Sequence, residues 1–298
     1  MQLSPSEARL GVAQGASAYV VWGLLPLFLH LLAGVPALEI LAHRVVWSLL
    51  LLLIVVTVAR AWGPIARALS VGRTLALLVA SASLIGINWL VYIWAVNNHY
   101  TLEASLGYFI IPLVNVALGV TLLGERLRRI QAIAVALAAI GVAGAVAAGG
   151  GSIWISLALA LTFGTYGLVR KVVAIDALGG LLVETALLAP PSLILLVLRG
   201  GGAFGQDGVQ DMLLISAGAI TATPLLLFAA AARKLRLSTM GLLQFIAPTL
   251  QFACATLVFH EPLRPSLLAA FVGIWAGCLL YAADSLRAAR LPAPEPAA

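Results

Sequence analysis

Ten apolar segments, each about as long as a lipid bilayer is thick, follow one another along nearly the whole chain. About 20 apolar residues in an α-helix span the hydrocarbon core, and a backbone in lipid must satisfy its own hydrogen bonds. The expected fold is therefore an all-α polytopic membrane protein with ten transmembrane helices. The segments cover residues 11–32, 37–59, 74–97, 102–123, 130–148, 153–169, 178–198, 211–232, 237–259 and 265–286.

The few charges are distributed as in a membrane protein. Only 9% of the 298 residues are charged, whereas roughly 25% are charged in soluble domains. Of the 17 Lys and Arg residues, Arg44 lies within an apolar segment, and Arg199 and Arg264 lie in outer links. The remaining fourteen lie in the inner links or towards the chain ends on the inner side. This follows the positive-inside rule if both termini are cytoplasmic. The net charge of +6 therefore reflects topology and does not indicate a nucleic-acid partner.

The two halves of the chain are related in sequence. Residues 106–127 align with residues 242–263 at an offset of 136, so that Pro112 matches Pro248 and Glu125 matches Glu261. Five segments per half would invert the second copy, and inverted repeats are typical of transporters. We predict a first repeat at 1–148, a second repeat at 149–290 and a disordered tail at 291–298.

Several stretches resemble the RarD group, which belongs to the EamA branch of the drug/metabolite transporter superfamily. The resemblance implies two EamA-type halves in a bacterial inner-membrane permease that exports small metabolites or drugs. It implies chloramphenicol-type compounds for the RarD group and amino acids for the wider superfamily. One departure is Ile111, where the group usually has Asn. The stretches are "AHRVVWS" (42–48), "NWLVYIWAVNNHYTLEASLGYF" (88–109), "GERL" (124–127), "YGLVRK" (166–171) and "LRLSTMGLLQFIAPTLQF" (235–252).

Polar groups inside the segments are expected to mark a substrate pathway. On insertion scales one ionisable side chain in a membrane span costs about 2.5–3.5 kcal/mol, so the presence of each such residue calls for a functional or structural explanation. Glu39, His43 and Trp47 recur every four residues and share a helical face, with Arg44 beside them. For Glu39 the alternative is an interfacial position at the outer end of its helix.

The turn between the third and fourth segments is unusually polar, with Asn97, Asn98, His99 and Glu103. Glu103 either stabilises the N-terminus of the next helix or pairs with Arg44 or His99. Because polar residues continue down both flanking helices, we predict that this turn forms the outer gate of the pathway.

Matching polar stripes occur in the fourth and ninth segments. Prolines in these stripes are expected to break their helices, and broken helices are tolerated where they line a cavity. Amides that tie helices together are the alternative. The stripes are Tyr108, Pro112 and Asn115 against Gln244, Pro248 and Gln251; the pathway is completed by Asn88, Tyr92, Trp94, Tyr166 and Glu184.

Other functional classes find little support in the sequence. No phosphate-binding loop occurs, so a gradient rather than ATP is expected to drive transport. No close pair of histidines favours a metal, and we expect neither a cofactor nor enzymatic activity. A channel is the main rival. The expected partners are a small-molecule substrate and the lipid bilayer, and a homodimer is left open.

Overall fold

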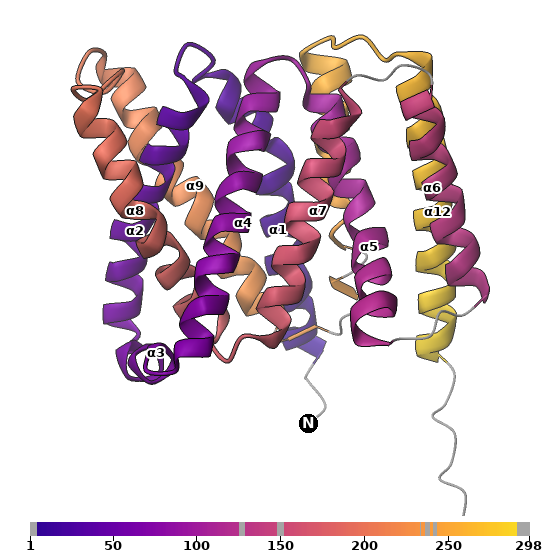
Figure 1. Cartoon of the computed structure of the whole chain (residues 1–298), viewed down its shortest axis with the longest axis horizontal. Helices are drawn as coiled ribbons and strands as arrows, with labels where there is room; N and C mark the ends of the chain where they lie inside the picture. Colours follow the sequence, from indigo (N-terminus) through magenta and orange to yellow (C-terminus); the bar gives the residue numbers. More distant parts are fainter. Residues whose placement is uncertain are drawn as a thin grey trace, which may run out of the picture.

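The computed structural model describes residues 5–124, 129–147, 152–232, 234–235, 239–240 and 243–290, and all regular secondary structure within them is helical (Figure 1). The helices are α1 (Pro5–His30), α2 (Ala37–Val58), α3 (Trp62–Leu69), α4 (Gly72–Asn97), α5 (Thr101–Leu123), α6 (Arg129–Ala147), α7 (Ile153–Val172), α8 (Ala177–Leu198), α9 (Gly208–Ala232), α11 (Ile246–Ala253), the π-helix η1 (Cys254–Val258) and α12 (Pro265–Arg290).

The described helices confirm the all-helical, polytopic class. Seven of them are long and apolar enough to cross a membrane, namely α1, α2, α4, α5, α7, α8 and α9, and shorter apolar helices occupy 129–144, 246–258 and 265–280. Large apolar side chains face outward, with Val58 79% and Leu198 80% exposed. Water would penalise such a surface, whereas lipid does not.

Successive long helices run in alternate directions (Figure 1). The α1–α2, α4–α5 and α8–α9 links lie at one face, and α1 begins and α12 ends at the opposite face. The short helix α3 lies across this second face. It occupies the link between the second and third predicted segments, where no helix was predicted. Within α3, the Ile65 side chain is buried while Trp62 is exposed, as expected for an amphipathic helix at a membrane interface.

Prolines interrupt the helices less than predicted. Pro112 was expected to break the fourth segment, but α5 continues through it from Thr101 to Leu123, so that prediction is wrong. A proline removes one backbone hydrogen bond, and neighbouring helices can hold the remaining turns together. In the ninth segment the irregular part precedes Pro248: Gln244 and Phe245 form a turn, and α11 begins at Ile246.

Helices α6 and α12 lie side by side at one end of the molecule (Figure 1). They contact the remaining helices chiefly through α5, where Phe109 packs edge-on against Phe271 and Trp275. Gly141 of α6 faces Gly273 of α12, so small residues allow the two backbones to approach closely. The sequence Gly273–Gly277 has the GxxxG spacing, and here it packs within the chain.

We predict that Gly277→Leu will separate this helix pair and destabilise the protein. A Cβ at Gly277 would lie 2.6 Å from the carbonyl oxygen of Ala134, so a side chain must displace backbone. Overpacking of this kind costs about 1–3 kcal/mol, which should lower the melting temperature in detergent. Gly144→Leu is the matched control because no described atom of another helix lies within 4 Å of the position that a Cβ would take at Gly144. Equal melting temperatures for the two variants would contradict this account.

Candidate functional site

Arg44 of α2 points into the helix bundle and is only 4% exposed. Its Nε donates a hydrogen bond to Oγ1 of Thr221 on α9, at 2.9 Å. Its guanidinium carbon lies 5.3 Å from the ring centroid of Trp89 on α4, a cation–π contact. Nη1 is buried and has no hydrogen-bond partner. Among the described residues, no carboxylate forms an ion pair with Arg44.

Two tyrosines lie near this arginine, and an asparagine is bonded to one of them. The rings of Tyr92 on α4 and Tyr108 on α5 meet edge to face with centroids 5.5 Å apart, and both lie within electrostatic range of Arg44. The Tyr108 hydroxyl donates to Oδ1 of Asn88 at 3.2 Å. Asn88 in turn donates to the hydroxyl of Thr162 on α7, so three helices are joined by one chain of polar contacts.

Gln251 of α11 brings the second half of the chain to the same place. Its Nε2 donates to the carbonyl oxygen of Trp22 on α1 at 3.1 Å, and its side chain is adjacent to Tyr92. The Gln251 Oε1 and the Tyr92 hydroxyl are both buried without a hydrogen-bond partner. We name this group the central polar cluster and define it as Arg44, Asn88, Tyr92, Tyr108, Thr221 and Gln251.

The electrostatics of the central polar cluster are unusual because arginine keeps its charge at physiological pH. A charged side chain at a membrane helix centre costs about 2.5–3.5 kcal/mol on insertion scales, even where neighbours can help. Trp89 and Thr221 offset part of this cost for Arg44. An uncompensated buried charge and several unpartnered polar atoms favour binding over a purely structural role.

A second buried group surrounds Glu184 of α8. Its carboxylate accepts hydrogen bonds from Ser81 of α4 at 2.5 Å and from the Tyr166 hydroxyl of α7 at 3.2 Å. Arg170 of α7 lies 3.5 Å from the same carboxylate. Of these residues, Glu184 and Tyr166 had been predicted separately as pathway residues, and the fold brings them together.

The α8–α9 loop covers the N-terminal end of α2. Glu39 accepts a hydrogen bond from the backbone N–H of Ala203, and Phe204 stacks on His43 at 5.2 Å between centroids. Trp47 also contacts Phe204. Glu39, His43 and Trp47 therefore use their shared helical face to hold this loop. Gly202 permits the arrangement, since its φ is 61° and a Cβ there would collide with the Glu39 carboxylate.

The polar turn at 97–103 is attached to neighbouring links. Asn97 donates to the carbonyl oxygen of Val35 in the α1–α2 link at 3.3 Å, while Asn98 donates to Trp94 within its own helix. His99 follows the end of α4, is exposed and has a φ of 61°. Because α4 ends at Asn97, His99 does not share a helical face with Asn88 and Tyr92.

The N-terminus of α5 is held by a residue that the site prediction had omitted. The Glu261 carboxylate accepts hydrogen bonds from the backbone N–H groups of Thr101 and Leu102, both at 2.9 Å. Glu103 accepts a hydrogen bond from the Ser152 hydroxyl at 2.6 Å. The alternative in which Glu103 pairs with Arg44 or His99 is not observed among the described residues. Carboxylates at this position also interact favourably with the helix dipole.

Three other predicted pathway residues lie away from the central polar cluster. Trp94 is 37% exposed and contacts Tyr100 and Trp154 on the outer surface, so it does not point inward. Asn115 is exposed and faces Gly164 of α7. Gln244 is half-buried in the turn before α11. The two stripes thus do not line one surface in this structure, although each has a member in the central polar cluster.

The cluster and its surroundings contain residues that sequence reasoning missed. Trp89 and Thr221 contact Arg44, and Ser81 bonds to Glu184. Tryptophan, threonine and serine are ordinary in membrane helices, so nothing in the sequence distinguished them. Glu261 did carry a signal, because it matches Glu125 in the repeat at the same distance from a proline.

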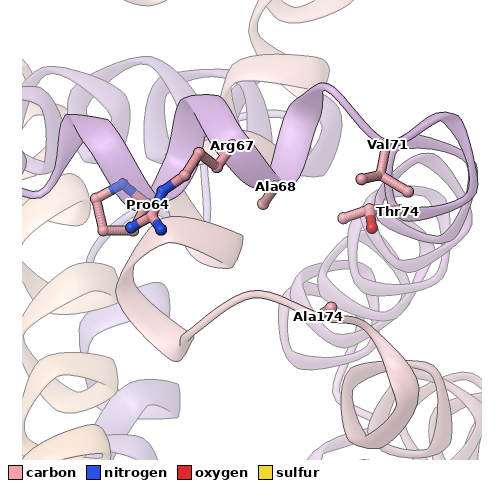
Figure 2. A pocket seen from close by; sticks show the side chains of 6 residues that line it. All are labelled: Pro64, Arg67, Ala68, Val71, Thr74 and Ala174. Atoms are coloured by element: carbon pink, nitrogen blue, oxygen red, sulfur yellow. The ribbon is translucent and has the colours of Figure 1, made fainter.

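A surface pocket lies between α3, the start of α4 and the α7–α8 link. Figure 2 shows side chains from α3 and the start of α4 on one side and Ala174, in the α7–α8 link, on the other. None of the predicted pathway residues lines it. Its lining consists of Pro64, Arg67, Ala68, Val71, Thr74 and Ala174.

Comparison with known proteins agrees with a transporter. Residues 9–147 match the EamA-like transporter family. The chain is 46% identical to Protein RarD of Streptomyces exfoliatus, over 96% of this chain and 92% of that protein. It is 43% identical to Protein RarD of Salmonella typhi, over 95% and 98% respectively. It is 35% identical to the chloramphenicol-sensitive protein RarD of Pseudomonas aeruginosa, over 94% and 96%.

A solved structure titled "Crystal structure of protein" shares the fold, with a TM-score of 0.61, 17% identity and coverage of 93% of this chain and 98% of that one. A buried polar cluster inside a polytopic helix bundle, together with these relatives, defines a membrane transporter. More specifically, the chain belongs to the RarD group of EamA-like transporters in the drug/metabolite transporter superfamily.

Proposed function

We propose that this protein is a secondary transporter that moves small molecules by alternating access between two inverted five-helix repeats. The observation that carries the proposal is a reciprocal pattern of helix packing. The matched pairs would be α1 with α7, α2 with α8, α4 with α9, α5 with α11, and α6 with α12. Exchange of conformation between such repeats converts an outward-facing state into an inward-facing one.

The larger helix–helix contacts are consistent with this exchange. Helix α4 packs on α7, and its counterpart α9 packs on α1. Helix α5 packs on α7, and α11 packs on α1; helix α2 packs on α9, and α8 packs on α4. The pairs α2 with α8, α5 with α11 and α6 with α12 pack on each other, as expected for helices next to a pseudo-two-fold axis.

Matched side chains support the same relation. Gln251 of α11 bonds to the Trp22 carbonyl, beside Gly23 of α1. Asn115, its counterpart on α5, faces Gly167 of α7, which follows Tyr166 as Gly23 follows Trp22. The two amides are therefore at equivalent interfaces between the halves, α11 with α1 and α5 with α7.

The central polar cluster is the proposed substrate site. It draws residues from both repeats, so movement of one repeat against the other would open it to either face in turn. Because one relative is named chloramphenicol-sensitive, chloramphenicol-type compounds are the first candidate substrates. Amino acids are the second, because amide and aromatic groups beside a charge suit an amphipathic zwitterion.

We predict that the purified protein in liposomes will catalyse counterflow. Vesicles loaded with unlabelled chloramphenicol, or with unlabelled L-phenylalanine in a parallel series, receive a trace of the same labelled compound outside. An alternating-access carrier should concentrate the label transiently inside without ATP or an ion gradient. The reason is that unlabelled substrate leaving the vesicle keeps returning the binding site to the outer face, where it takes up label. Protein-free vesicles are the control. Label that only equilibrates would indicate a channel, and chemical alteration of the probe would indicate an enzyme.

We further propose that the protein resides in the bacterial inner membrane with both termini cytoplasmic, on the basis of the fourteen-to-two distribution of Lys and Arg over inner and outer links. A reporter fused after residue 290 tests this orientation. Green fluorescent protein at that position should fluoresce, and alkaline phosphatase should be inactive. Active alkaline phosphatase, which requires the periplasm, would contradict the proposed topology.

The turn at 97–103 and the links bonded to it are proposed to form the outer gate. Glu261 fastens the start of α5 to the link before α12, and Asn97 fastens the end of α4 to the α1–α2 link. Ser105 of α5 also donates to the carbonyl oxygen of Pro248 in α11, at 2.8 Å. Opening of the outer face must break bonds of this kind between the two repeats.

We predict that Glu261→Gln will favour outer opening, because the neutral amide cannot accept both backbone hydrogen bonds with the strength of a carboxylate. The reporter is Ser105→Cys in a background where Cys254 and Cys278 are alanine. Reaction of this buried cysteine with a membrane-impermeant maleimide from outside should become about tenfold faster if the balance shifts by about 1.4 kcal/mol.

Asp207→Asn is the matched control, since Asp207 is an exposed acidic residue of the α8–α9 loop. The control should leave the labelling rate unchanged. A labelling rate that is the same in Glu261→Gln and in its parent would show that the carboxylate only caps α5 and has no gating role.

A further inference from the structure

We infer that the central polar cluster recognises a carboxylate, so that the substrate is a small organic acid carrying a hydrogen-bond donor next to its carboxylate. A 2-amino acid or a 2-hydroxy acid has this pattern. The inference rests on the proposed transport function, since movement of the repeats is what would bring such a molecule to a buried site.

The first observation is that the charge of Arg44 has no counter-ion among the residues that the structure describes. The described acidic residues that share or approach its helix are engaged elsewhere. Glu39 accepts from Ala203 and lies about 140° around the helix from Arg44, given 100° per residue. Glu184 is bonded to Ser81, Tyr166 and Arg170. Asp211, near the start of α9, accepts from the backbone of Gly205.

The second observation is that Arg44 is held in place by contacts that leave its charge uncancelled. Thr221 accepts from Nε, and the Trp89 ring covers the guanidinium, while Nη1 is buried without a hydrogen-bond partner. A planar guanidinium fixed at one edge is well suited to bind a carboxylate through its other edge. An arginine with a purely structural role in a membrane protein would be paired with an internal acid or with backbone carbonyls, and Nη1 of Arg44 has neither partner among the described residues.

The third observation is the chemical pattern of the neighbouring unpartnered atoms. The Tyr92 hydroxyl can donate a second hydrogen bond to a carboxylate held by Arg44. The Gln251 Oε1 can only accept, because its Nε2 is oriented by the Trp22 carbonyl. Its nearest donor is the adjacent Tyr92 hydroxyl, and when that hydroxyl donates to the ligand carboxylate instead, Gln251 Oε1 is left to accept from a donor on the ligand, such as an amine or a hydroxyl. Two donors and one acceptor together match a 2-amino or 2-hydroxy acid and mismatch its amide.

Thermal unfolding of the purified protein tests this inference independently of transport. The probes are L-leucine, L-phenylalanine, their 2-hydroxy acid analogues and the matching amides. At concentrations well above the dissociation constant, at least one of the acids should raise the melting temperature of the wild-type protein by a few degrees, and its amide should not. Arg44→Met should bind that acid about 100-fold more weakly or worse.

Stability without ligand separates a binding role from a structural one. Replacing an uncompensated buried charge by methionine should leave the melting temperature unchanged or raise it. Arg44→Lys keeps the charge without the planar fork, so it should retain the preference for acid over amide with weaker binding. Arg199→Met, at an exposed arginine after α8, is the control and should respond to ligand like the wild type.

Three results would overturn the inference: no acid stabilises the wild type, the amides stabilise it as well as the acids do, or Arg44→Met binds the acids normally and melts at a lower temperature. Failure here and failure of the transport proposal are distinguishable. Counterflow of chloramphenicol together with no stabilisation by any of the acids would leave the carrier function standing and reject carboxylate recognition. Acid binding without counterflow of that acid would support recognition and reject the carrier.

Discussion

The structure depends on one constraint: lipid offers no hydrogen-bond partners, so a polar group within the bilayer can be satisfied only by another group of the protein. Backbone groups meet this constraint by forming helices, which is why the described part of the chain is helical almost throughout. Hydroxyl side chains meet it by bonding to the preceding turn, as Thr57, Thr185 and Thr249 do. Carboxylates meet it by accepting several bonds at once, as Glu184 and Glu261 do. Against this background, the unpaired guanidinium of Arg44 is the exception that most suggests a ligand.

The same constraint concentrates polar groups where helices from the two halves meet. Small residues bring the backbones close there: Gly218 of α9 lies against Trp47 of α2, and Gly23 of α1 lies against Leu250 of α11. Close approach shortens the distance that a side chain must reach to find a partner in the other half. Arg44 reaches Thr221 and Gln251 reaches Trp22 in this way. The interface that stabilises the bundle is therefore also the one that would move during transport.

Much of the fold could be predicted because hydropathy is a property of consecutive residues. Length and apolarity located the seven long helices and the three shorter ones, and the repeat relation identified Glu261 as the partner of Glu125 in sequence. The short helix α3 escaped prediction because eight residues are too few for a hydropathy signal. The expected break at Pro112 was wrong because the effect of a proline depends on the helices packed around it.

The site was less predictable, for a physical reason. Spacing along a helix assigns a residue to a face, and it correctly grouped Glu39 with His43 and Trp47, which together hold the α8–α9 loop. It does not say which neighbour that face meets, so Trp94 was placed in the pathway although it lies at the outer surface. By itself, the sequence determined that lipid surrounds the protein, which segments are helices and in what order they follow. These properties follow from local apolarity and from the charges between segments. Only the tertiary structure decided that Glu184 has a cation beside it while Arg44 has no anion within the described part of the chain, because pairing depends on contacts between helices that are distant in the chain.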